Sequence, residues 1–195
     1  ENDVATITLN RPQALNARGL KMREEILDAV LRAEKEARAL VITGAGRGFC
    51  SGGDVKEMKE RREKEGDVVA KETDMPTRDR VVLALRGMGI PTIASVNGVA
   101  AGAGCNLALA CDIRIASSEA SFGEVFVRRG LHPDWGGTYL LPWLVGTAKA
   151  CELIFTGDII DAQEALRLGM VNRVVPPDQL KEETHQFARR LASGP

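Results

Sequence analysis

Short apolar runs alternate along this chain with amphipathic segments that have helical spacing. Val4–Leu9 is rich in β-branched residues and predicts a strand, closed by an Asn-Arg-Pro turn. Ala39–Thr43 is apolar without alternation, as expected for a strand covered on both faces. Between these runs one helical face is apolar, at Met22, Ile26, Val30 and Ala33. Strand, helix and strand in this order predict a parallel, right-handed crossover.

The same alternation continues to the end of the chain. Val81, Leu85 and Met88 predict a helix, and Asp112–Ala116 and Val171–Val175 predict strands. The last third is mainly helical. Thr147 is expected to cap a helix to Phe155, Asp161–Glu164 resembles a capping box, and Pro177 is expected to start the last helix. The pattern predicts one α/β domain over residues 1–195.

Thr92–Ala110 is the stretch around which the chain is organised. A short apolar run predicts a buried strand, which passes through Gly98, Gly102 and Gly104 into an Ala/Leu-rich helix. Glycines at a helix start leave backbone N–H groups approachable, and the helix dipole adds partial positive charge there. Such a corner suits a phosphate or a carbonyl oxygen that becomes negative during a reaction.

Composition and charge exclude several function classes. The 195 residues carry 26 basic and 27 acidic side chains, so nothing in the balance favours a nucleic acid or membrane partner. The four cysteines lack Cys-x-x-Cys spacing and are expected to be free thiols in a reducing compartment. With two histidines, a histidine-based metal site is not expected. We expect a cytoplasmic protein, or a mitochondrial matrix protein if the source is eukaryotic.

Two further segments invite a functional interpretation. Gly44–Asp54 contains Gly-x-Gly, but the third glycine is misplaced for a dinucleotide fingerprint, so we expect a turn that brings backbone close to another group. Lys56–Lys71 is dense in Lys and Glu and predicts a solvated helix or loop. Trp135 and Trp143 are expected in the core or in a pocket wall.

Separated segments of the chain match known motifs. Arg47–Met58 is similar to the loop F-C-A-G-x-D-[ILV]-K-E-M, and Asn97–Gly104 resembles the helix start N-G-x-A-x-G-G-G, both from the crotonase (enoyl-CoA hydratase/isomerase) family. Gly130–Thr138, Leu141–Gly146 and Ala162–Asn172 resemble downstream motifs in the same order. The resemblance implies an α/β fold of the ClpP/crotonase type with a ββα spiral core. We expect the C-terminal helical segment of that fold to be missing from this chain.

The resemblance also implies an acyl-CoA thioester substrate, with coenzyme A as part of the substrate and no separate cofactor. It implies an oxyanion hole made by the backbone N–H groups of Gly53 and Ala103. It further implies a homotrimer or a dimer of trimers. The positions matched to substrate contacts are Ala17, Ser51, Asp54, Val55, Met58, Gly102, Asn106 and Phe126.

The chain departs from typical hydratases at both catalytic glutamates of that reaction. Asn106 and Phe126 stand at the matching positions, and neither an amide nor a phenyl ring accepts a proton near neutral pH. Asp134 lies where crotonase-like isomerases of the 1,2-epoxyphenylacetyl-CoA isomerase type, from phenylacetate breakdown, carry an Asp. We expect Asp134 to move the proton, with its pKa raised by an apolar neighbour such as Phe126.

Several activities remain open at this point. The first hypothesis is isomerisation of a double bond (or of an epoxide or oxepin) in an enoyl-CoA. The second is hydration of an enoyl-CoA in fatty-acid or aromatic-acid breakdown. The third is a thioester hydrolase or dehalogenase-like enzyme with Asp134 as nucleophile. The fourth is a catalytically silent trimer subunit. Asn106 either contacts substrate or water, or satisfies backbone groups; Asp54 is expected to cap or orient the oxyanion loop.

Overall fold

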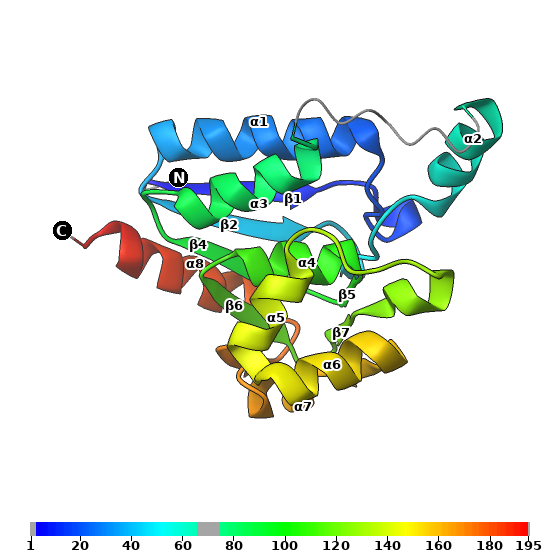
Figure 1. The fold of residues 1–195 in the computed structure, drawn as a ribbon. Helices are drawn as coiled ribbons and strands as arrows, with labels where there is room; N and C mark the ends of the chain where they lie inside the picture. The colour runs from blue at the N-terminus through cyan, green and yellow to red at the C-terminus, as the bar shows by residue number, and fades with distance from the viewer. Residues whose placement is uncertain (1–2, 66–74, 195) are drawn as a thin grey trace.

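The computed structural model describes residues 3–65 and 75–194, and its main sheet is entirely parallel. The strands of this sheet match the apolar runs predicted from the sequence, and Figure 1 shows them through the middle of the molecule. In spatial order they are β1 (Val4–Leu9), β2 (Ala39–Gly44), β4 (Thr92–Val96), β6 (Ile113–Ser117) and β9 (Arg173–Val175).

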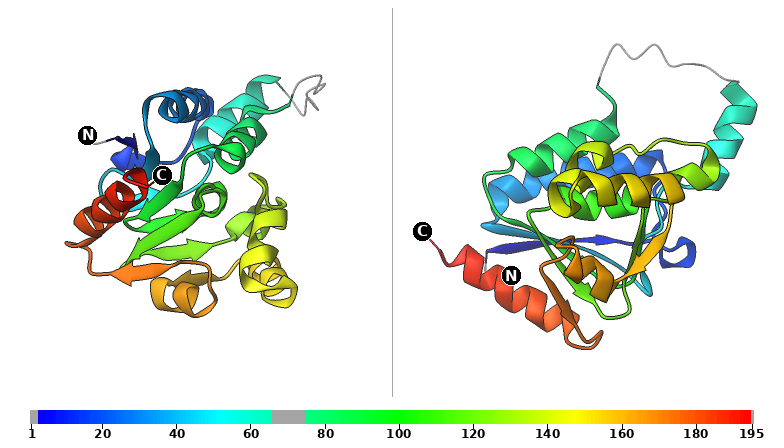
Figure 2. Two further views of the ribbon diagram at one scale, coloured as in Figure 1. Left: turned by 90° about the vertical axis from the view of Figure 1, so that its left-hand side faces the viewer. Right: turned by 60° about the horizontal axis from the view of Figure 1, so that its bottom comes forward.

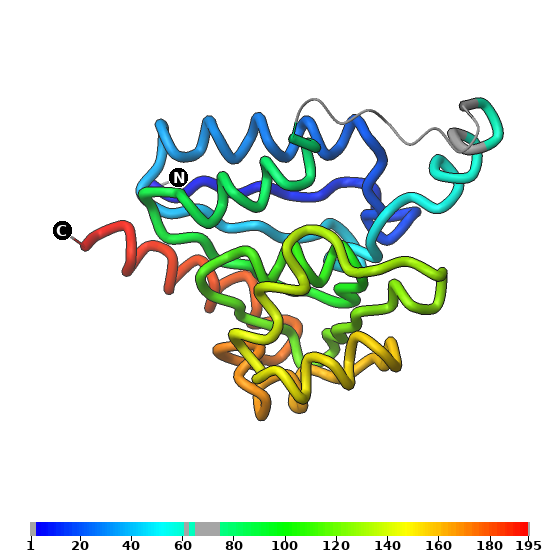
Figure 3. Tube along the Cα trace, in the orientation of Figure 1, coloured from blue at the N-terminus to red at the C-terminus, as the bar shows by residue number. Residues whose placement is uncertain are grey.

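A second sheet is built from short strands that the sequence pattern did not predict as strands. It consists of β3 (Gly48–Cys50), β5 (Val99–Ala101), β7 (Ser121–Gly123) and the antiparallel β8 (Ile159–Asp161). The chain passes from β2 to β3, from β4 to β5 and from β6 to β7, so that it winds repeatedly between the two sheets (Figure 3). This winding, with helices between its turns, is the expected ββα spiral.

Helices connect the successive turns of this spiral. They are α1 (Leu20–Glu36), α2 (Val55–Glu65), α3 (Thr77–Gly87), α4 (Ala103–Ala110), α5 (Gly137–Val145), α6 (Thr147–Thr156), α7 (Ala162–Arg167) and α8 (Leu180–Ala192). Two short 3-10 helices are η1 (Pro12–Ala14) and η2 (Val125–Arg129). Among the described helices, none combines the length and the apolar character that crossing a bilayer requires.

The main sheet is buried on both faces. In β2, Leu40 and Ile42 join the large core that includes α1, α3 and α4, whereas Ala39 and Val41 pack with α8 on the opposite face. Figure 2 shows α8 alone on that side of the sheet and the other long helices beyond it. Strands that are covered on both faces have continuous runs of apolar residues. This confirms the prediction, made from such a run, that β2 is covered on both faces.

Some local predictions were wrong, and one concerns residues outside the described part of the chain. Gly146, with φ +81°, takes the N-cap place of α6, so Thr147 is the first helical residue and not the cap. Pro177 lies in a turn, and α8 begins at Leu180. Trp135 is buried as expected, but Trp143 is 77% exposed beside Tyr139. Of the predicted solvated segment, residues 66–71 lie outside the described part.

Candidate active site

The corner between β5 and α4 is built from small residues. Gly102, at the N-cap of α4, has φ +52° and ψ −125°, a conformation that side chains disfavour. Its N–H donates to the carbonyl oxygen of Gly123 at 2.7 Å, which fixes the turn. A Cβ on Gly104 would collide with the carbonyl of Cys50 in β3. Because these glycines have no side chain, the start of α4 can pack directly against the backbone at the end of β3.

That loop brings a second backbone segment to the same place. A Cβ on Gly52, which has φ +105°, would lie 3.9 Å from the backbone nitrogen of Ala103. Arg18 N–H donates to Gly52 O at 2.8 Å, and Asp54 N–H donates to Arg18 O at 3.1 Å. In the described part of the chain, no acceptor is found for the N–H of Gly53 or of Ala103. Two unpaired donors thus sit on neighbouring backbones, the arrangement that an oxyanion requires.

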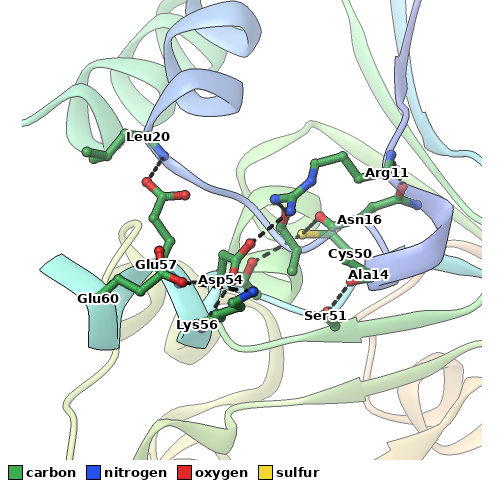
Figure 4. Close-up of polar contacts among 12 residues, drawn as sticks. Arg11, Ala14, Asn16, Leu20, Cys50, Ser51, Asp54, Lys56, Glu57 and Glu60 are labelled. Atoms are coloured by element: carbon green, nitrogen blue, oxygen red, sulfur yellow. Dashed lines mark hydrogen bonds and ion pairs between the residues drawn. The ribbon is translucent and has the colours of Figure 1, made fainter.

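Asp54 holds this loop in place (Figure 4). Its Oδ2 accepts from Arg11 Nη2 at 2.9 Å, while its Oδ1 accepts from the N–H groups of Lys56 and Glu57 at 3.1 and 3.2 Å. The backbone hydrogen bond from Glu57 and the bond from Arg11 lower the pKa of the Asp54 carboxyl. Asp54 therefore caps α2 and ties the residue after Gly53 to the η1 region, the role predicted for it.

The expected pocket residues surround this loop. Ser51 Oγ donates to Ala14 O at 3.3 Å, and Ala17 O accepts from Arg11 Nη1 at 2.8 Å, so both hold backbone next to the loop. Val55 and Met58 are about half exposed on α2, and the sulfur of Met58 lies 3.4 Å from a Cβ position on Gly53. Val55 and Met58 thus lie at the start of α2, next to Gly53.

Phe126 and Asn106 approach from the other side of the corner. The Phe126 ring lies 3.6 Å from a Cβ position on Gly102 and is 9% exposed. Asn106 is fully buried, and its Nδ2 donates to Asp134 O at 2.8 Å and to Glu124 Oε2 at 3.4 Å. Of the two roles left open for Asn106, the contacts favour the satisfaction of protein groups.

Asp134 lies in the loop between η2 and α5. Its Oδ1 is buried without a hydrogen-bond partner among the described residues. Burial raises the pKa of this carboxyl, opposed by the charges of Arg18, Arg78 and Arg23. The direction agrees with the sequence-based expectation, but the arginines that moderate the shift were not anticipated. Trp135 next to it has φ +53°, so the loop is held in a conformation that non-glycine residues rarely adopt.

Sequence reasoning missed a second carboxyl, Glu124. It is 1% exposed, and burial raises its pKa to about 7, opposed by hydrogen bonds with Cys105 and Asn106. Its Oε1 has no partner among the described residues. A single acidic residue inside the apolar run Ser121–Val127 was the signal that could have found it. Glu124 and Asp134 are linked through the amide of Asn106.

Arg18 was also missed. Its guanidinium carbon lies 3.7 Å from the centroid of the Trp135 ring, and the residue is 1% exposed. Within the described chain, its Nε, Nη1 and Nη2 have no hydrogen-bond partner. The signal was one arginine between Ala17 and Gly19 in a tightly packed turn. A buried guanidinium without a hydrogen-bond partner is costly unless a nearby negative charge balances it.

Metal and thiol chemistry have little support at this corner. The residues described here include no cluster of His, Cys, Asp and Glu suited to hold a metal ion. All four cysteines are free, and burial raises the pKa values of Cys105 and Cys111. Such thiols are poor nucleophiles because the thiolate is disfavoured. The polar groups that the corner offers for chemistry are backbone donors and carboxyls.

Comparison with known proteins identifies the family. The enoyl-CoA hydratase/isomerase family matches residues 1–195. Short-chain-enoyl-CoA hydratase of Clostridium acetobutylicum is 42% identical over 197 residues, covering 99% of this chain and 73% of that protein. 1,2-Epoxyphenylacetyl-CoA isomerase of Escherichia coli K12 is 39% identical over 200 residues, covering 100% and 75%. The crystal structure of enoyl-CoA hydratase from Bacillus anthracis superimposes with a TM-score of 0.90 at 35% identity, covering 98% of this chain and 74% of that one.

Sequence, fold and site geometry therefore agree. The backbone corner at Gly53 and Ala103, the ββα spiral and the match over the full chain have one explanation. The chain belongs to the crotonase (enoyl-CoA hydratase/isomerase) family, spanning about three quarters of the length of the relatives compared.

Proposed function

We propose that this protein isomerises the double bond of an enoyl-CoA thioester. The N–H groups of Gly53 and Ala103 hold the thioester oxygen as it becomes negative. Asp134 removes a proton from the carbon next to the thioester carbonyl of a 3-enoyl-CoA, and the electron pair spreads into a dienolate. The same carboxyl returns the proton to the far end of the dienolate, which gives a 2-enoyl-CoA with no atoms gained or lost.

The observation that carries this proposal is the buried Asp134 carboxyl, which interacts electrostatically with Arg23, a side chain that lies 4.0 Å from a Cβ position on Gly53. A carboxyl with an unpartnered buried oxygen and a raised pKa is better suited to hold and return a proton than an ordinary exposed carboxyl. Each preorganised donor to the oxyanion is worth about 3 kcal/mol of transition-state stabilisation. Asn106 and Phe126, at the positions of the two hydratase glutamates, offer no proton acceptor.

Hydration is the second candidate, and two observations favour it. Most of the relatives compared carry hydratase names. The structure also holds a second carboxyl, Glu124, linked to Asp134 through the Asn106 amide. A hydratase activity of this chain would have to use Glu124 in place of the missing glutamates. Against this, Glu124 is 1% exposed and its Oε2 already faces Asn106.

The test is incubation of the whole chain with a 3-enoyl-CoA, with crotonyl-CoA and with 1,2-epoxyphenylacetyl-CoA, followed by absorbance and product mass. Isomerisation leaves the mass unchanged, hydration adds one water, and thioester hydrolysis releases free coenzyme A. Asp134→Asn should lower the isomerisation rate by roughly 10²–10⁴-fold, the usual contribution of a general acid–base. Asp178→Asn is the control because Asp178 is exposed before α8. Full isomerase activity of Asp134→Asn would refute the assignment.

A further inference from the structure

Three arginines from separate segments converge beside Asp134, and we call them the arginine cluster: Arg18, Arg23 and Arg78. Arg18 precedes α1, Arg23 lies in the second turn of α1, and Arg78 lies in the first turn of α3. α1 and α3 pack side by side (Figure 1). Positive side chains near helix N-termini are unfavourable because the helix dipole is already positive there. The arginine cluster therefore places positive charge near two helix N-termini, where a negative charge would be favourable.

Two arginines of the cluster, Arg18 and Arg23, are incompletely neutralised. Arg78 Nε lies 3.6 Å from Asp79 Oδ1. Glu57 Oε1 is engaged by the N–H of Leu20 at 2.9 Å, and Asp134 acts on the arginines through space. In the described residues, no ion pair or hydrogen bond joins the guanidinium of Arg18 or Arg23 to a carboxylate. A buried cation without a partner is costly, and the cost is recovered if a ligand supplies the counter-charge.

The position of Arg23 connects the cluster to the substrate. Its Nη2 lies 4.0 Å from a Cβ position on Gly53, one of the two proposed oxyanion donors. The Arg23 side chain is half-buried, and it interacts electrostatically with Arg18, which is buried against Trp135. A ligand whose thioester oxygen is held at Gly53 would thus meet Arg23 first, with the charge of Arg18 behind it.

We propose that the arginine cluster binds a carboxylate carried by the acyl group, so that the preferred substrates are enoyl-CoA esters of dicarboxylic acids. Arg23 makes the direct, charge-assisted contact, and Arg18 stabilises the bound anion from behind. A guanidinium presents paired N–H donors that match the two oxygens of a carboxylate. This inference rests on the proposed function in two respects, the placement of the thioester at Gly53 and Ala103 and the reach of Asp134 to the acyl carbons.

The acyl group is a better source of the anion than the nucleotide part of coenzyme A. Asp134 must reach the acyl carbons in the proposed reaction, and it interacts electrostatically with each arginine of the cluster. Phosphates are strongly hydrated, and Arg18 is almost completely buried. A carboxylate at the end of the acyl group is desolvated together with the carbon chain when that chain is buried, so it can reach a buried guanidinium.

The test measures binding and does not depend on turnover. Saturated esters are compared in pairs of equal chain length, such as hexanoyl-CoA with adipoyl-CoA and butyryl-CoA with succinyl-CoA, by titration calorimetry. The carboxylated member of at least one pair should bind about tenfold or more tightly, as expected for a charge-assisted hydrogen bond. Arg23→Leu and Arg18→Met should each remove this preference. Arg32→Leu, an exposed arginine of the same helix paired with Asp28, should retain it.

The outcomes separate the two proposals. If the wild-type chain binds both members of every pair equally, the carboxylate inference is overturned, even if neutral 3-enoyl-CoA esters are isomerised. The affinity of coenzyme A without an acyl group is measured as well. If Arg23→Leu weakens its binding as much as it weakens the binding of the carboxylated esters, the cluster binds a phosphate and the inference is also overturned. If the preference exists but no isomerisation occurs, the binding inference stands and the proposed reaction fails. The wild-type comparison decides the question even if the Arg18 variant does not fold.

Discussion

Asn106 Nδ2 donates a 2.8 Å hydrogen bond to the backbone carbonyl oxygen of Asp134. The same carbonyl accepts from Gly137 N–H at 3.1 Å, so the residue proposed to carry the proton is fixed through its backbone. Gly137 also makes room for the amide, since a Cβ there would collide with the Asn106 side chain. The Asn106 side chain therefore holds the backbone of the loop that carries the Asp134 carboxyl.

Replacing Asn106 should therefore affect turnover more than binding. Asn106→Leu keeps the branched shape of the side chain but removes the bond to Asp134, so we expect kcat to fall about tenfold or more with a smaller change in KM. The free energy of unfolding should fall by about 1–3 kcal/mol, because buried polar partners lose their donor. Steady-state kinetics with a 3-enoyl-CoA and chemical denaturation measure the two effects. Asn172→Ala, which removes a bond to Arg114 N–H, is the control for lost stability; an unchanged kcat in Asn106→Leu would contradict the positioning role.

Glu124 makes stability depend on pH in a direction opposite to that of most carboxyls. Burial raises its pKa in the folded protein to about 7, from an ordinary value of 4.5. Between these values the folded state holds a proton that the unfolded state has lost, so stability falls as pH rises. The loss is about 3 kcal/mol across this window, and stability is greatest below pH 4.5 as far as this group alone is concerned.

The measurement is the free energy of unfolding of wild type and Glu124→Gln as a function of pH. The difference between the two curves should shrink or reverse as pH rises from 4.5 to about 7, because the amide carries no charge to bury. Glu119→Gln is the control, since Glu119 is exposed in the turn before β7. Parallel curves for wild type and Glu124→Gln would mean that the Glu124 carboxyl is not titrating in this window.

The strands and helices with strong periodicity could be predicted from sequence, and the second sheet could not. β1, β2 and α1 could be predicted because of the spacing of their apolar residues. These residues form a continuous or alternating run in the strands and recur about every 3.6 residues in the helix. β3 (Gly48–Cys50) and β5 (Val99–Ala101) are too short and too rich in glycine to carry such a period. Their position is set by packing between layers, which no local pattern records.

The residues of the candidate site also fall into two groups, those that could be predicted from the sequence and those that could not. Gly53, Ala103 and Asp134 were predicted from their match to crotonase motif positions, and their catalytic roles stay predictions. Arg18 and Glu124 were missed because their importance comes from burial among residues distant along the chain. Trp143 was misplaced because an aromatic residue on an amphipathic helix looks the same whether or not its face is covered.

Gly104 should be indispensable for the contact between α4 and β3. In an isolated helix, Gly→Ala is favourable by about 1 kcal/mol, but here the added methyl would meet the carbonyl group and Cβ of Cys50, and backbone cannot move aside cheaply. We expect Gly104→Ala to lower the free energy of unfolding by about 1–3 kcal/mol. Gly87→Ala is the matched control, because a Cβ at this end of α3 meets nothing within 4 Å and should be neutral or stabilising. Equal stability of the two variants by denaturant titration would contradict the tight approach.

Asp54 should couple the stability of α2 to the geometry of the oxyanion hole. Asp54→Ala removes the acceptor for the N–H groups of Lys56 and Glu57 and the ion pair with Arg11, which is partly exposed and so contributes little by itself. The lost cap should cost about 1 kcal/mol. Because Gly53 directly precedes Asp54, its N–H should lose its fixed direction, and kcat with a 3-enoyl-CoA should fall about tenfold or more.

Asp161→Ala separates these effects, because Asp161 caps α7 through the N–H of Glu164 at 2.8 Å, on a part of the chain that contributes nothing to the proposed site. It should show a comparable loss of stability with unchanged kcat. Asp54→Asn adds a second comparison, since the amide oxygen can still accept from Glu57 N–H but the charge facing Arg11 is gone. We expect Asp54→Asn to recover most of the turnover lost in Asp54→Ala. If both Asp54 variants keep wild-type turnover while α2 is destabilised, the cap does not orient the Gly53 donor.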